Sequence, residues 1–266
     1  MLKQRLITAA LGLPLVTAIV WSGEPWFTLM VAIGGLLGAI EFYRMAATKG
    51  RPLTYFGLLW TLLFIVSPHF DYYRVTPLLL TSAVVLSLIW LVLRPRQREE
   101  AFMGWVWTIG GILYVGWLLS HLVALRGLSA GRDWVFLALF PTFASDSTAF
   151  FVGRAWGRHY LAPVISPQKT WEGAITGVIA AIIVSLAVTA FFGLPLSYGQ
   201  ALLLGLLISI FGQLGDLAKS LLKRNVGLKD SGRLMPGHGG MLDRIDSILF
   251  AGAIAYYFVA LTIPGG

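Results

Sequence analysis

The chain has 266 residues, of which 57% are hydrophobic and only 12% are charged, and its mean hydropathy is +0.78. Soluble domains carry about 25% charged residues, so these proportions exclude an ordinary soluble protein as well as a disordered or fibrous chain. The absence of cysteine excludes disulfides, thiolate metal sites and cysteine nucleophiles.

Long apolar runs predict an all-α, polytopic integral membrane protein with about nine transmembrane helices. In chain order, the runs cover residues 6–22, 26–43, 53–67, 77–93, 101–125, 134–153, 173–193, 200–222 and 241–262. Lys3 and Arg5 precede the first run as in a signal peptide, but no small-residue cleavage site follows it, so we expect a retained helix. The run at 53–67 is short for a span, and we expect it to start earlier, to tilt or to lie in a thinner bilayer.

The basic residues orient these spans. If nine spans alternate, all 20 Lys and Arg residues except Arg74, Arg126 and Arg132 fall on one side of the membrane. The positive-inside rule makes that side cytoplasmic. We therefore expect a cytoplasmic N-terminus and a C-terminus on the far side.

The two parts of the chain differ in kind. Residues 1–133 have short loops, and we expect them to form structural, lipid-facing helices. Residues 134–266 contain two longer cytoplasmic segments, 154–172 and 223–240, and half of the 12 acidic residues. We therefore expect the catalytic site in residues 134–266, facing the cytoplasm.

An acidic residue interrupts the apolar run at 200–222. Asp216, Lys219, Ser220 and Lys223 share one face of a helix at their spacing, and Arg224 follows them. A carboxylate about two turns inside the membrane is costly if it faces lipid, so Asp216 is a functional candidate. The simpler alternative is an Asp216–Lys219 ion pair at the membrane interface, which would contribute little.

The next segment brings further acids to a similar depth. The Pro- and Gly-rich stretch at 235–240 breaks the helix, and Asp243 and Asp246 follow on one face at the start of the last span. Helix N-termini favour carboxylates, which accounts for these two residues but not for Asp216. Acids beside several Lys and Arg residues suit a divalent cation that holds a phosphorylated substrate.

A third group of polar residues lies at 145–173. Asp146 is again about two turns from the cytoplasmic end of its span, and Arg154 and Lys169 supply cations that phosphates need. The segment contains neither a Walker A loop nor a Rossmann fingerprint.

Four stretches resemble the signature of the phosphatidate cytidylyltransferases, also called CDP-diacylglycerol synthases. They read Ser-Pro-Gln-Lys-Thr-Trp-Glu-Gly at 166–173, Ser-Leu-Leu-Lys-Arg at 220–224, Lys-Asp-Ser-Gly at 229–232 and Leu-Met-Pro-Gly-His-Gly-Gly-Met-Leu-Asp-Arg-Ile-Asp at 234–246. The similarity also covers Asp146 and the residues up to 166. Residues 1–133 share only their hydropathy pattern with the family.

The resemblance implies that phosphatidate attacks the α-phosphorus of CTP, giving CDP-diacylglycerol and diphosphate. It implies Mg²⁺ as cofactor, and leaves open whether a second cation shares the site. The partners it implies are CTP, phosphatidate and membrane lipids, without nucleic acid, and a homodimer is the common default. The expected location is a bacterial-type plasma (inner) membrane.

The same chemistry assigns roles to individual residues. Asp216 and Asp243 are the expected leading metal ligands, and Asp246 and Asp146 are further ligands or hydrogen-bond partners of the ligands. His238, with Gly239 and Gly240, forms a tight turn that contacts the leaving diphosphate or only stabilises the loop. The expected phosphate-binding and substrate-binding residues are Lys169, Lys219, Lys223, Arg224, Ser220, Arg154 and Arg244.

Two other functions remain open on these residues. A CTP-dependent lipid or polyprenol kinase would use the same cation and cytidine sites but would release CDP in place of diphosphate. A secondary transporter would use the buried acids to couple ions to its substrate, although we find no internal repeat of the kind many transporters show.

Overall fold

A computed structural model of the chain describes residues 2–94, 98–228, 232 and 239–263, and of residues 2–11 and 98–99 only the backbone. The chain divides into two compact units. The first contains Met1–Ala124 and Asn225–Ile245, and the second contains Leu125–Arg224 and Asp246–Gly266.

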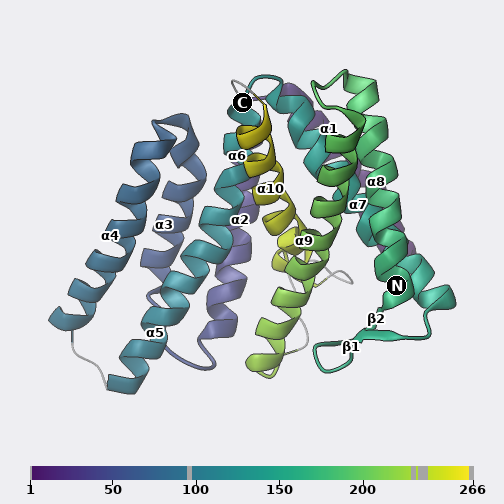
Figure 1. Cartoon of the computed structure of the whole chain (residues 1–266). Helices are drawn as coiled ribbons and strands as arrows, with labels where there is room; N and C mark the ends of the chain where they lie inside the picture. The colour runs from purple at the N-terminus through teal and green to yellow at the C-terminus, as the bar shows by residue number, and fades with distance from the viewer. Residues whose placement is uncertain (1, 95–97, 229–231, 233–238, 264–266) are drawn as a thin grey trace. The chain divides into compact units, whose positions relative to one another are not determined.

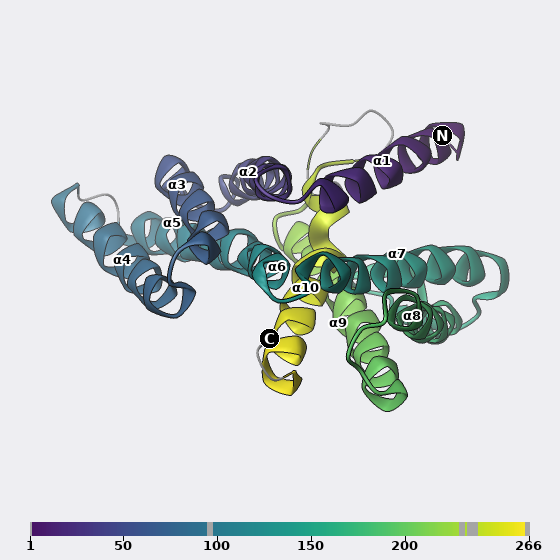
Figure 2. The same ribbon diagram turned by 90° about the horizontal axis from the view of Figure 1, so that it is seen from above.

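The first unit is built mainly from helices in its described residues. Its elements are α1 (Leu2–Ser22), α2 (Trp26–Ala46), α3 (Thr54–Val66), the 3₁₀-helix η1 (Ser67–His69), α4 (Tyr72–Leu93), α5 (Arg98–Gly111), the π-helix η2 (Ile112–Trp117) and most of α6 (Leu118–Gly127) (Figure 1). Helices α3 and α4 lie side by side, where Trp60, Phe64, Leu79, Ala83 and Ile112 form a buried cluster (Figures 1 and 2). Much of α4 remains exposed in spite of its apolar sequence, as expected of a helix that faces lipid.

The second unit contains helices and one hairpin. Its elements are α7 (Gly131–Trp156), β1 (Tyr160–Ala162), β2 (Ser166–Thr170), α8 (Trp171–Phe192), α9 (Tyr198–Asn225) and α10 (Leu242–Thr262), of which the first turn of α10 and the last residue of α9 belong to the first unit. Strands β1 and β2 pair antiparallel, with Tyr160 opposite Thr170 and Ala162 opposite Ser166. The hairpin therefore connects α7 to α8, which lie side by side in Figure 2.

Glycines allow the helices of the second unit to approach closely. A Cβ atom on Gly173 would lie 2.6 Å from the backbone oxygen of Ala149, which shows how tightly α8 packs on α7. A Cβ atom on Gly215 would lie 2.5 Å from the backbone oxygen of Asp246, so α9 and α10 are equally close at this level. Small residues at such contacts are typical of membrane helix packing.

The described helices agree with the predicted class of fold. Seven are long and apolar enough to cross a membrane, and two shorter apolar helices, Gly12–Ser22 and Thr54–His69, match the predicted spans at 6–22 and 53–67. The prediction of an all-α polytopic membrane protein is confirmed at this level. The number of spans, their orientation and the functional division at residue 133 stay predictions.

The hairpin is an addition to the predicted fold. Its strands have three and five residues and lie within the segment predicted only as a cytoplasmic connection. The sequence Ser-Pro-Gln-Lys-Thr of β2 lacks the alternation of apolar and polar residues that predicts a strand. The antiparallel pairing with β1 holds it extended.

Candidate functional site

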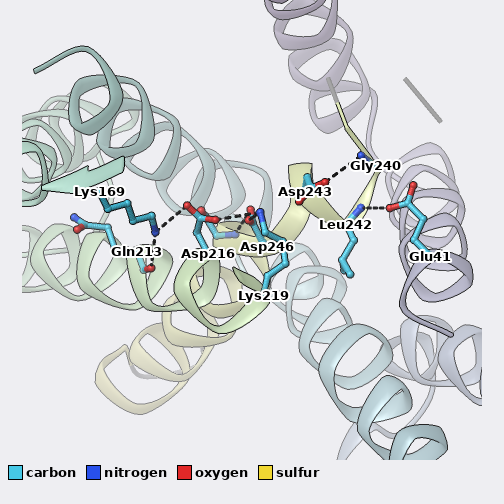
Figure 3. Close-up of polar contacts among 10 residues, drawn as sticks. Glu41, Lys169, Gln213, Asp216, Lys219, Gly240, Leu242, Asp243 and Asp246 are labelled. Atoms are coloured by element: carbon cyan, nitrogen blue, oxygen red, sulfur yellow. Dashed lines mark hydrogen bonds and ion pairs between the residues drawn. The ribbon is translucent and has the colours of Figure 1, made fainter. Parts of the chain in front are cut away.

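Four charged side chains of the second unit form a chain of alternating sign. Lys169 Nζ lies 2.8 Å from Asp216 Oδ2, and Lys219 Nζ lies 3.1 Å from Asp216 Oδ1. The same Lys219 ammonium donates to Oδ2 of Asp246 (Figure 3). We call these four residues the charged chain. It joins strand β2, helix α9 and helix α10.

The inner end of the charged chain is buried. Lys219 and Asp246 are each 5% exposed, whereas the side chains of Lys169 and Asp216 are 23% and 33% exposed. Asp246 also accepts a hydrogen bond from the backbone N–H of Ser247 at 2.7 Å. Buried charges are tolerated only when they are paired, and two ammonium groups here face two carboxylates.

Local sequence explains why these side chains meet. Asp216 and Lys219 are three residues apart on α9, a spacing that puts them on one helix face. Gly215, beside them, admits the backbone of α10 at Asp246. The β2 strand ends at Thr170, whose side chain caps α8, so Lys169 stands just before a helix start.

A hydrogen-bonded network among residues of α7, α8 and α9 holds the Lys169 ammonium in place. Lys169 donates to the backbone oxygen of Gln213 at 3.4 Å (Figure 3). The Gln213 amide in turn donates to the backbone oxygen of Ala174 at 3.1 Å and to Ser209 Oγ at 3.0 Å. Ser209 is hydrogen-bonded to Ser145 at 2.7 Å. The network connects α7, α8 and α9 next to the charged chain.

The ion pair between Asp216 and Lys219, which we considered as a simple alternative, is present. It is part of a larger arrangement, however, because Lys169 also binds Asp216 and Lys219 also binds Asp246. An isolated interfacial pair would not bury Lys219 to 5% exposure.

The other predicted residues of the second unit lie on α7 and α9. Asp146 is exposed on α7, within electrostatic range of Asp216, Lys169 and Lys219. The remaining four are on the last turns of α7 and α9: Arg154 and Arg224 are exposed, and Ser220 and Lys223 are half-buried. Nε of Arg224 donates to the backbone oxygen of Ile165 in the hairpin at 3.3 Å.

The predicted residues of the first unit lie in or just after the turn predicted at 238–240, which we call the signature turn. Gly239 has a φ of +77°, which favours glycine. The N–H of Gly240 donates to Oδ2 of Asp243 at 3.1 Å, and Arg244 is exposed. His238 lies outside the described residues.

The structure does not test the predicted sharing of one metal ion by Asp216 and Asp243. Asp243 belongs to the first unit and Asp216 to the second. The pairing therefore stays a prediction.

Glu41 on α2 is a residue whose role the sequence did not reveal. The sequence by itself predicts only an i,i+3 pair with Arg44 at a membrane interface. In the structure, Glu41 is only 1% exposed and accepts hydrogen bonds from the N–H groups of Met241 and Leu242. A useful signal was present, because an acidic residue inside an apolar span is a functional candidate by the reasoning applied to Asp216.

The carboxylates fit a metal ion that is shared with a substrate. Among residues 2–94, 98–228, 232 and 239–263, no three His, Asp or Glu side chains form a group that could hold a metal ion alone. The carboxylate oxygens of Asp216 and Asp246 contact Lys169, Lys219 and the N–H of Ser247, so a cation would take the place of one of these partners. Mg²⁺ commonly uses one or two carboxylates with phosphate oxygens and waters. The donor set suits such a cation and does not suit a closed cage of protein ligands.

Comparison with known proteins agrees with this chemistry. The cytidylyltransferase family model matches residues 3–262. The phosphatidate cytidylyltransferase of Bacillus subtilis (strain 168) is 34% identical over 266 residues, covering 98% of each chain. That of Brucella abortus biovar 1 (strain 9-941) is 36% identical over 262 residues, covering 98% of this chain and 94% of the relative. Phosphatidate cytidylyltransferase 5, chloroplastic, of Arabidopsis thaliana is 34% identical, covering 96% of this chain and 71% of the relative. The chain therefore belongs to the cytidylyltransferase family.

Proposed function

We propose that this chain is a phosphatidate cytidylyltransferase. An oxygen of the lipid phosphate attacks the α-phosphorus of CTP, the bond between the α-phosphorus and the bridging oxygen breaks, and diphosphate leaves as CDP-diacylglycerol forms. The charged chain is the observation that carries the proposal, because it presents cations and carboxylates together on and beside helices long and apolar enough to cross a membrane. The relatives that match nearly the whole chain carry this name.

Lys169 is the residue of the charged chain best placed to contact a substrate phosphate. Its side chain is 23% exposed, and it precedes the N-terminus of α8 on a hairpin strand. Its ammonium can exchange the Asp216 carboxylate for a phosphate oxygen without becoming buried and unpaired. Lys169 therefore neutralises charge on a reactant, which matters because both reactants are anions.

Lys219 has a different role in the proposed reaction. It is buried between Asp216 and Asp246, and its ammonium holds the two carboxylates in place. Asp216 and Asp246 would hold Mg²⁺, with or without a second cation, which when bound supplies charge neutralisation to the phosphates. The lipid phosphate is already nucleophilic near neutral pH, so the residues need to position it and do not need to deprotonate it.

We further propose that the rim of this site binds the remaining phosphate oxygens. Its residues would be Asp146, Arg154, Ser220, Lys223 and Arg224, all in the second unit. By the sequence motif alone, His238, Gly239, Gly240 and Arg244 of the first unit would also contact substrate. The site would face the cytoplasm of a bacterial-type plasma membrane, where CTP is available to a lipid headgroup. A homodimer is the oligomeric state we would test first.

Product identification tests the proposed function. Purified protein in detergent receives phosphatidate, Mg²⁺ and CTP labelled at the α-phosphate or, separately, at the γ-phosphate. We expect the α label in lipid and the γ label in free diphosphate. Label from the γ-phosphate in lipid, with release of CDP, would identify a lipid kinase, and counterflow in proteoliposomes without CTP would identify a transporter.

Kinetics also test the separate sequence prediction that Asp216 and Asp243 are the leading ligands of one metal ion. Asp216→Asn and Asp243→Asn keep the side-chain shape and remove one charge each, so each variant should insert in the membrane and lose nearly all activity. If both residues serve one metal ion, the double variant is scarcely worse than either single variant. Substantial turnover by Asp216→Asn at saturating Mg²⁺ would assign the metal to Asp243, Asp246 and Asp146.

A further inference from the structure

A buried carboxylate from α2 occupies the N-terminus of α10. Glu41 Oε1 accepts the N–H of Met241 at 2.9 Å. Glu41 Oε2 accepts the N–H of Leu242 at 2.9 Å (Figure 3). Glu41 is 1% exposed. Residues 41 and 241 are 200 positions apart in the sequence, so this contact is purely tertiary.

The Glu41 carboxylate accepts hydrogen bonds from backbone N–H groups that have no acceptor within the helix. The first N–H groups of an α-helix have no partner within the helix, and its N-terminus carries partial positive charge. Such caps are usually supplied by the residue just before the helix. Here Asp243 accepts the N–H of Gly240, and Glu41 accepts the next two, so two carboxylates satisfy three consecutive amides.

The same carboxylate also shapes the chain before the turn. A Cβ atom on Gly232 would lie 2.6 Å from Glu41 Oε1, so a side chain at this position would require the Glu41 carboxylate to shift. Glu41 therefore contacts the signature segment on both sides of residues 233–238. A carboxylate buried to this degree is stable only because hydrogen bonds compensate its lost hydration.

We propose that Glu41 is a positioning residue for the signature turn. By holding the amides of Met241 and Leu242, it sets the start of α10 and with it the direction of the Asp243 side chain. While Asp243 and Glu41 hold the N–H groups of Gly240, Met241 and Leu242, these three amides are not donors for a substrate phosphate. The expected effect of Glu41 on the catalytic rate rests on the proposed function. Its expected effect on the geometry of the turn does not.

Two variants and a matched control separate positioning from plain stability. Glu41→Ala removes both acceptors, and Glu41→Gln keeps one acceptor oxygen in nearly the same shape. Asp71 is the control, because its side chain accepts the N–H of Arg74 at the start of α4 in the same unit and lies outside the proposed site. Asp71→Ala thus removes a cap from a helix that carries none of the proposed chemistry.

The first measurement is hydrogen exchange of the peptide that covers residues 239–245. Loss of a hydrogen bond to a charged group should speed exchange of Met241 and Leu242 about tenfold in Glu41→Ala. Glu41→Gln should show a smaller increase, and Asp71→Ala should show none at these amides. Unchanged exchange in Glu41→Ala would overturn the proposal outright.

The second measurement is steady-state kinetics of the same variants. We expect kcat to fall about tenfold or more in Glu41→Ala with little change in KM for CTP, because a misplaced Asp243 affects the transition state more than binding. Glu41→Gln should recover part of kcat, and Asp71→Ala should retain it. Faster exchange with unchanged kcat would refute the positioning role.

If the wild-type chain forms no CDP-diacylglycerol, the proposed function fails, and hydrogen exchange still decides whether Glu41 holds the turn. If Glu41→Ala does not fold, Glu41→Gln decides both questions.

Discussion

Removal of the Lys219 ammonium tests how the charged chain is held together. Lys219→Met keeps the length and much of the packing of the side chain but removes its charge. Asp216 would retain Lys169 at 2.8 Å, whereas the buried carboxylate of Asp246 would lose its ammonium partner. The variant should therefore be less stable than Asp246→Asn, in which Lys219 still has Asp216 at 3.1 Å.

The contacts indicate the size of these effects. Removing one partner of a buried ion pair costs about 3–5 kcal/mol, and a lost hydrogen bond to a charged group costs about 1.5–3 kcal/mol. Domains of 150–250 residues lose about 2–4 °C of Tm per kcal/mol. Lys219→Met should lower Tm by about 6–20 °C on this scale, and Asp246→Asn by less.

The double variant Lys219→Met/Asp246→Asn gives the decisive comparison. It leaves Lys169 paired with Asp216 and removes the uncompensated carboxylate, so it should be more stable than Lys219→Met alone. Coupling of contacting residues is commonly about 0.5–3 kcal/mol. Thermal unfolding in detergent, followed by the fluorescence of the ten tryptophans, measures all three variants. A wild-type Tm for Lys219→Met, or strictly additive losses in the double variant, would refute the pairing.

Three further predictions concern the hairpin, the helix packing and the orientation. Lys169→Ala should raise KM for CTP or phosphatidate at least about tenfold. The exposed residue Lys49 gives a control of equal charge change, Lys49→Ala. Unchanged kinetics in Lys169→Ala would assign Lys169 to the surface. Gly215→Ala should lower both activity and Tm, because its Cβ would lie 2.5 Å from the backbone oxygen of Asp246. Gly34→Ala is the control: its Cβ would have nothing within 4 Å, so activity should stay intact and Tm should stay the same or rise slightly. Reporter fusions at the two ends should report opposite sides of the membrane, and the same side for both would contradict the nine-span prediction.

The sequence by itself determined the class of protein and the location of most candidate residues. Hydropathy is a property of consecutive residues, so the apolar runs predicted helices that the structure contains. Asp216 and Lys219 are on the same helix, and their shared face follows from a spacing of three. The signature motif, read in one dimension, was enough to predict the family that the comparisons establish.

Only the tertiary structure decided which of these residues meet. Lys219 and Asp246 are 27 positions apart, and their pairing depends on how closely α9 and α10 pack at Gly215. Lys169 reaches Asp216 because a hairpin, which the polar sequence of β2 does not predict, ends beside α8. Glu41 shows the limit most clearly. Its sequence neighbourhood indicates only a charge in an apolar span, because hydrogen bonds between segments 200 residues apart depend on packing and leave no local pattern.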